Sequence, residues 1–199
     1  MDKKQDSQKE RRDYSAQISV DDLLVLKRLI GHTVHCVYAS CLQVAGRHQT
    51  APSFSIPISS NVEGHWMHRY FNFHCAWSET PHTLTDYWQI FVSLDSRPHD
   101  VEVHSEKGLL APCTIRYFHT APINKIEVYE FHWSTGEEQD SESVIYDKAI
   151  HFHLENAKSF CIACQLNGPG IATEMHISDD DDTIRTFLEG SRLRLSIPA

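Results

Sequence analysis

The stretch VIYDKAIHFHLENAKSFCIACQL, residues 144–166, indicates the fold of this chain more clearly than any other segment. Apolar residues at positions 150, 152 and 154 alternate there with polar residues at 151, 153 and 155. Successive side chains on a strand point to opposite faces of a sheet, so this period of two predicts a strand with one buried face. A second apolar run, residues 158–166, follows the turn residues Asn156 and Ala157. The segment therefore predicts a β-hairpin.

Further strand-like runs lie on both sides of this hairpin. They are rich in β-branched and aromatic residues and are bounded by turn residues. The predicted strands cover residues 33–44, 70–77, 88–94, 101–104, 113–119, 123–133, 171–177 and 193–197. Residues 47–64 contain Pro52, Pro57 and several serines, which predicts a long loop or an irregular edge.

Two helices are expected near the ends of the chain. Ser19 and Gly31 are typical start and stop residues around a first helix over residues 19–30. Ser178 and Gly190 mark a second over residues 178–189, with Asp181 at the capping-box position. The predicted fold class is α+β: a large, mostly antiparallel sheet, either open or a half-barrel, with a short N-terminal and a C-terminal helix. Residues 1–17 are expected to form a disordered polar arm, and residues 18–199 a single β-rich domain.

Composition indicates a protein of an intracellular compartment. The chain has no apolar run near the roughly 20 residues of a membrane-spanning helix, and its first residues are polar, so we expect a cytoplasmic protein.

The six cysteines are an even number, but without signs of secretion we expect free and mostly buried thiols. They are Cys36, Cys41, Cys75, Cys113, Cys161 and Cys164.

The net charge of −9 argues against nucleic acid as a partner, because no basic run exists outside residues 3–12. An acidic chain can attract a basic protein. Two acidic segments are candidates for such a contact. The predicted partner-binding residues are Glu137, Glu138, Asp140, Glu142, Asp179, Asp180 and Asp182.

Two apparent metal motifs have a structural explanation. The run Asp179–Asp182 lies at a predicted helix start, where unpaired N–H groups and the helix dipole favour carboxylates. Cys161 and Cys164 have the CxxC spacing, but residues three apart on a strand point to opposite faces. Neither motif is expected to bind metal.

The 14 histidines are the least ordinary part of the composition. His151 and His153 lie on the same face of the predicted strand, about 7 Å apart, a spacing found in metal sites. They are the candidate ligands for zinc or another transition metal, with His132, His176 or Glu155 as possible third ligands. The alternative interpretation is that the histidines are scattered over the surface and bind no cofactor.

No G-x-S-x-G motif, P-loop or dinucleotide fingerprint is present. The leading functional hypothesis is therefore an acidic binding protein, such as an immunity protein or inhibitor that neutralises a basic, toxin-like partner. The first alternative is an enzyme that uses histidines and acids, with or without a metal ion. The second is a structural module that self-associates, for example as a homodimer. Neither nucleic acid nor a membrane is an expected partner.

Overall fold

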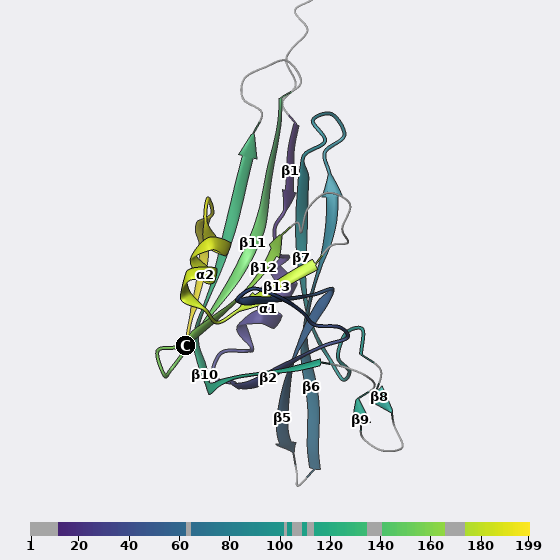
Figure 1. Ribbon diagram of the computed structural model, residues 1–199, viewed down its shortest axis with the longest axis vertical. Coiled ribbons are helices and arrows are strands. Elements are labelled where there is room, and N and C mark those ends of the chain that lie inside the picture. The colour runs from purple at the N-terminus through teal and green to yellow at the C-terminus, as the bar shows by residue number, and fades with distance from the viewer. Residues whose placement is uncertain are drawn as a thin grey trace, which may run out of the picture.

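A computed structural model describes residues 12–62, 65–101, 103–104, 109–110, 114–134, 141–165 and 174–199. The fold is a large, mostly antiparallel, open β-sheet with two short helices (Figure 1), as the sequence predicts. Among the described residues, no helix has the length and apolar character needed to cross a membrane.

The strands are numbered in chain order. They are β1 (Arg12–Ala16), β2 (Thr33–Ala39), β3 (Gln43–Ala45), β4 (His48–Ala51), β5 (Ser53–Val62), β6 (His65–Glu79), β7 (Asp86–Asp95), β8 (Val103–His104), β9 (Leu109–Leu110), β10 (Thr114–Ser134), β11 (Glu142–Leu154), β12 (Ser159–Gln165), β13 (Glu174–Ser178) and β14 (Arg192–Pro198). The helices are α1 (Val20–Lys27) and α2 (Asp181–Leu188). The hairpin predicted from residues 144–166 is confirmed as β11 and β12, with the turn at Asn156 and Ala157.

The main sheet has the order β3-β4-β13-β12-β11-β10-β2-β5-β6-β7, and β8 and β9 form a separate pair. β10 pairs with β2 through residues 114–122 and with β11 and β14 from residue 123 onward. The prediction of two separate strands over 113–119 and 123–133 is thus wrong for residues 114–134. A register shift between Tyr117 and Ala121 takes the place of the expected break.

Within the predicted loop over residues 47–64, residues 48–51 and 53–62 form strands, and residues 63 and 64 lie outside the described residues. β4 and β5 occupy most of this segment, and β5 is hydrogen-bonded to β6 along its whole length. Phe54 and Ile56 are fully buried, so their packing outweighs the local preference of the serines and prolines. Pro57 is tolerated because the neighbouring β2 pairs with β5 at a single residue, Ser55.

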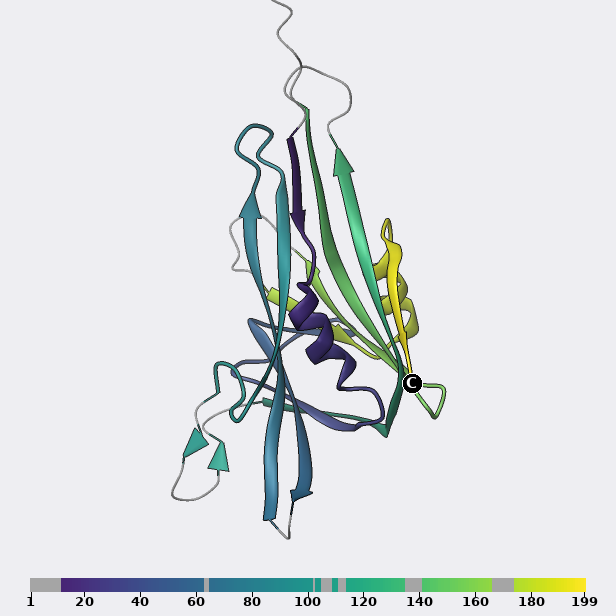
Figure 2. The same ribbon diagram turned by 180° about the vertical axis from the view of Figure 1, so that it is seen from behind.

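The curved sheet folds into two layers that enclose α1 (Figures 1 and 2). One layer contains β10 to β13, and the other contains β5 to β7. Leu26 of α1 and the following Leu29 are fully buried between them. Phe73 of β6 and Phe152 of β11 meet across the core edge to face, with ring centroids 5.9 Å apart. Helix α2 packs on the outer face of β11 and β12.

The expectation of a disordered arm through residue 17 is wrong for Arg12–Ala16. These residues form β1, which pairs in parallel with residues 142–146 of β11. β12 reaches only residues 149–153 of β11, so the edge beyond them is open to β1. The remaining residues of the predicted arm, 1–11, lie outside the described residues.

Both helices are shorter than the sequence predicts. Ser19 is the N-cap of α1, as expected, and accepts a hydrogen bond from the Asp22 N–H. The N-cap of α2 is Asp180 and not Ser178. Ser178 is the last residue of β13, and its hydroxyl donates to the Arg47 carbonyl 3.0 Å away.

Candidate metal centre

Two neighbouring strands bring Glu127, His151 and His153 together. Glu127 of β10 lies opposite His151 of β11 in the antiparallel register. Their chain neighbours Ile126 and Ile150 are fully buried in the core, so the three polar side chains share the outer face of the sheet. This is the face on which α2 packs.

The three side chains offer one carboxylate and two imidazoles at close range. His153 Nε2 lies 2.8 Å from Glu127 Oε2, and His151 Nδ1 lies 4.0 Å from the same oxygen. The two imidazole centroids are 4.1 Å apart. One ligand atom from each residue lies within 4.8 Å of the others, and no second cluster of this kind occurs in the described part of the chain.

These spacings suit a small metal ion. Two ligands that are each 2.0 Å from a tetrahedral zinc ion are about 3.3 Å apart. The distances of 2.8 Å and 4.0 Å lie on either side of that value. Small side-chain rotations would therefore bring the three atoms to ligand distances, with the ion in place of the proton shared by His153 and Glu127.

Glu127 is ionised and held from two further sides. Lys125 Nζ lies 2.8 Å from its Oε1, and the Tyr129 hydroxyl donates to Oε2 at 3.0 Å. Burial alone raises the pKa of Glu127, but the hydrogen bonds from Lys125, His153 and Tyr129 lower it to about 2. The carboxylate is thus a negatively charged donor at neutral pH.

His151 is neutral at pH 7. Burial, with a smaller contribution from the adjacent His153, lowers the pKa of its imidazole to about 4. Its Nε2 atom is buried and has no hydrogen-bond partner among the described residues. Buried polar atoms are nearly always paired, so the lack of a partner at Nε2 is unusual. The other ring nitrogen, Nδ1, is the one that lies 4.0 Å from Glu127 Oε2.

One side of the cluster opens to solvent. His153 lines a recess of about 550 Å³ with Asn124, Lys125, Lys158 and Ser159. Its side chain is 28% exposed, whereas that of His151 is 13% exposed. The cluster therefore has an enclosed half and an accessible half.

The sequence identified two of these three residues. His151 and His153 do share a face, but none of the proposed third ligands joins them. His176 packs against His48, with ring centroids 5.0 Å apart, and His132 and Glu155 are exposed elsewhere. Glu127 was missed, although residues 125, 127 and 129 alternate with buried residues and carry the signal. Choosing among them needs the register of β10 against β11.

Glu142 is not the surface residue that the acidic-segment hypothesis requires. Its side chain is buried at the start of β11, and the carboxylate accepts hydrogen bonds from the N–H and hydroxyl of Thr83 and from Tyr14. These contacts connect the β6–β7 turn to β11. Glu137, Glu138 and Asp140 lie outside the described residues.

The second acidic segment is part of the start of α2. Asp180 caps the helix by accepting hydrogen bonds from the N–H and hydroxyl of Thr183. Arg47 pairs with both Asp180 and Asp182, at 3.4 and 3.6 Å. The helix-start interpretation of Asp179–Asp182 is confirmed, and the predicted contact of Asp179, Asp180 and Asp182 with a partner stays a prediction.

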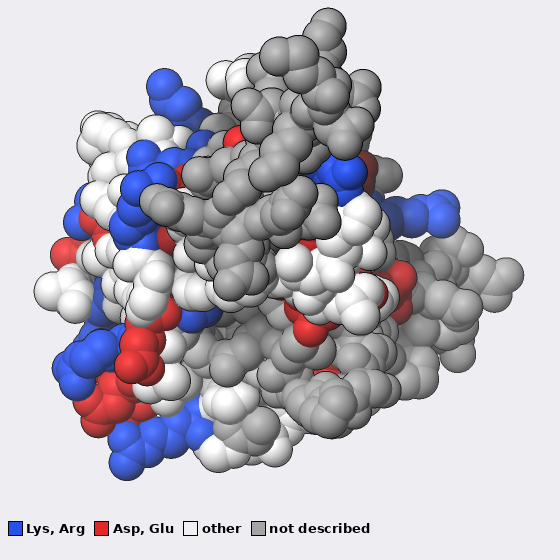
Figure 3. Space-filling model, turned by 90° about the horizontal axis from the view of Figure 1, so that it is seen from above, with Lys and Arg blue, Asp and Glu red and all other residues white. Residues whose placement is uncertain are grey.

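Charge is also mixed on one end of the molecule. Figure 3 shows basic and acidic side chains interspersed over the described part of the upper face.

The prediction that Cys161 and Cys164 point to opposite faces of the sheet is confirmed. Cys161 packs under α2, and Cys164 lies in the main core on the opposite face. None of the five described cysteines is in a disulfide, and Cys41 is exposed.

Comparison with known proteins gives no relative: no family model, no curated protein and no solved structure matches this chain.

Proposed function

We propose that this protein binds a divalent transition-metal ion, zinc foremost, through Glu127, His151 and His153, and that the bound ion serves an enzymatic reaction. The observation that carries the proposal is the convergence of one donor atom from each of the three residues within 4.8 Å. Two imidazoles and one carboxylate form a donor set used by zinc enzymes.

The open side of the cluster favours an enzymatic site over a structural one. Structural zinc sites are closed by four protein ligands, whereas catalytic sites have three and leave one position for water or substrate. The recess beside His153 provides access to that position. A zinc ion held there would act as a Lewis acid on a bound water or a substrate oxygen.

The residues around the donors have supporting roles. Lys125 holds Oε1 of Glu127 and leaves Oε2 directed at the two imidazoles. Tyr129 fixes the same carboxylate from a second direction. Outer contacts of this kind orient metal ligands and keep their geometry. Lys158 and Ser159 offer a cation and a hydroxyl to a substrate in the recess.

The binding-protein hypothesis has less support. Glu142 is buried and Asp180 caps α2, so these two carboxylates are already used within the fold. A basic protein partner, like a cytoplasmic location, stays a prediction.

Zinc titration of the metal-free protein tests the proposed site. We expect one ion per chain by isothermal titration calorimetry, and a tetrahedral visible spectrum when Co²⁺ replaces zinc. His151→Ala and Glu127→Gln should each weaken zinc affinity at least about 100-fold, because each removes one of three donors. The matched control is His132→Ala, an exposed histidine on the same β10–β11 hairpin.

Two results would contradict the proposal. One is the absence of stoichiometric zinc or cobalt binding by the folded wild-type chain. The other is an equal loss of affinity in His132→Ala and His151→Ala, which would indicate nonspecific binding by surface histidines. Circular dichroism on each variant confirms that the fold is retained.

A further inference from the structure

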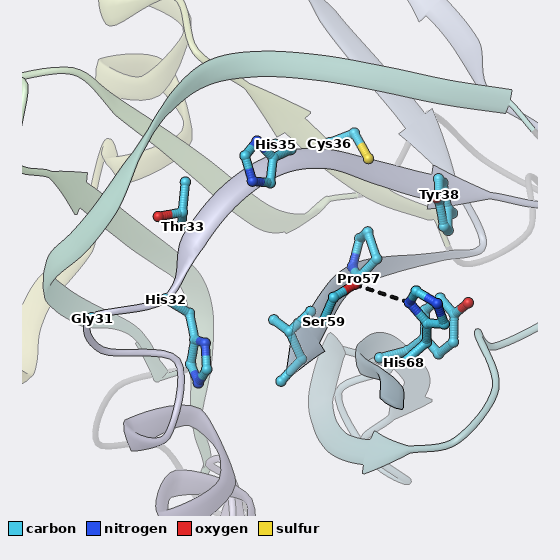
Figure 4. Close-up of a pocket in the computed structure, with 11 residues that line it drawn as sticks. Gly31, His32, Thr33, His35, Cys36, Tyr38, Pro57, Ser59 and His68 are labelled. Carbon is cyan, nitrogen blue, oxygen red and sulfur yellow. Dashed lines mark hydrogen bonds between the residues drawn. The ribbon is translucent and has the colours of Figure 1, made fainter. Parts of the chain in front are cut away.

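A second site lies between β2 and the β5–β6 hairpin (Figure 4). β2 and β5 share one register pair, Tyr38 with Ser55. Extending this antiparallel register by two residues would place Cys36 opposite Pro57, which has no backbone N–H to donate. The strands diverge from that point, and a pocket of about 580 Å³ occupies the space between them.

The described residues around the pocket are rich in hydrogen-bonding groups and carry no fixed charge. Three imidazoles line it, from His32, His35 and His68, together with the hydroxyls of Thr33 and Ser59. Among the described residues that line it, none is Asp, Glu, Lys or Arg, although 23% of the chain is charged. A charged ligand would lose hydration there without gaining a counter-ion, so the lining favours an uncharged one.

One wall of the pocket is aromatic. The half-buried rings of Tyr38 and Tyr70 lie 6.2 Å apart at an interplanar angle of 44°. Near the exposed mouth, Ser59 Oγ and His68 Nδ1 are hydrogen-bonded at 2.9 Å, which the dashed line in Figure 4 marks. The pocket thus combines two half-buried aromatic rings with exposed groups that both donate and accept hydrogen bonds.

We propose that this pocket binds an uncharged heteroaromatic ring compound of about nucleoside size. Tyrosine faces stack on flat rings. Imidazoles and hydroxyls, which both donate and accept, match the mixed edge of a heterocycle. The volume falls in the range of small-molecule sites. No residue is shared with the proposed metal centre, so this site stands independently of it.

The probes are adenosine and uridine, titrated into the full chain and followed by isothermal titration calorimetry. We expect at least one of them to bind with a Kd below about 1 mM. Adenosine 5′-monophosphate, which adds a dianion to the same ring, should bind at least about 10-fold more weakly than adenosine, and glucose should not bind. Absence of nucleoside binding would overturn the proposal, as would equal or tighter binding of the monophosphate, or binding of glucose alone.

Two variants test the location. Tyr70→Leu retains an apolar side chain but removes the π-face, and should weaken nucleoside binding about 10-fold or more. Ser59→Ala changes an exposed residue with little risk to the fold and should weaken it several-fold. The matched control is Ser15→Ala, an exposed serine on β1, with unchanged affinity. Unchanged affinity in Ser59→Ala and in a folded Tyr70→Leu would place binding elsewhere and overturn the assignment.

Discussion

Asp147 of β11 is a fully buried carboxylate that joins three parts of the chain. Arg194 of β14 binds it with two hydrogen bonds of 2.7 Å, and the Ile18 backbone N–H donates to it at 2.6 Å. Burial raises the pKa of Asp147 in spite of these contacts. A buried ion pair of this kind is costly to break, because the partner left behind has no water to replace the lost charge.

Arg194→Met should therefore lower the free energy of unfolding by about 3–5 kcal/mol. The double variant Arg194→Met with Asp147→Leu should lose less than the single variant, since no buried charge is left unpaired. Urea unfolding measures both. A loss in the double variant that equals or exceeds the loss in Arg194→Met would show that the two side chains do not act as a pair.

Glu142, the first residue of β11, is a second buried carboxylate. Burial by itself raises its pKa, but the hydrogen bonds from Thr83, Thr80 and Tyr14 lower the pKa to about 2. A carboxylate whose pKa is lower in the folded than in the unfolded state stabilises the fold at neutral pH. That contribution is complete above the unfolded pKa near 4.5 and is lost as the pH falls toward 2.

Glu142→Gln should lower the free energy of unfolding at pH 7 by about 1–3 kcal/mol, because an amide cannot accept the same set of hydrogen bonds. The difference from wild type should shrink as the pH falls from 4.5 to 2. Urea unfolding over this range, with the exposed Glu155→Gln as control, measures it. A difference that does not depend on pH would disprove the assigned ionisation.

β10 and β11 set the architecture at the scale of elements, because each pairs with different strands along its length. The sequence predicted the β11–β12 hairpin well, since its alternation and its turn are local. It did not predict β1, whose residues are mostly exposed and polar, with only Ala16 buried. β1 exists because β12 leaves residues 142–146 of β11 uncovered.

Deletion of residues 1–16 should lower the urea midpoint more than deletion of residues 1–11. The longer deletion removes β1 and exposes the β11 edge together with the Tyr14–Glu142 contact. Equal midpoints for the two truncated chains would show that β1 adds no stability. Circular dichroism provides a second measure of the strand that is lost.

At the scale of the whole molecule, the sheet bends until β7, the last strand of its order, lies beside β1 and β11. Thr83 and Glu142 connect these parts, and the rings of Tyr14 and Tyr87 lie 6.4 Å apart. Strand order of this kind is not encoded in local patterns. For the same reason the sequence could place His151 and His153 on one face but could not pair them with Glu127.

The parallel pairing of β1 with β11 also sets the order in which the chain can fold during synthesis. The Asp13 and Ser143 side chains that meet there are 130 residues apart in the chain. At roughly 5–20 residues per second, the ribosome needs about 6–26 seconds to make that interval. β1 thus waits for a partner that is translated much later, and the two layers close only when β10 to β13 have left the ribosome.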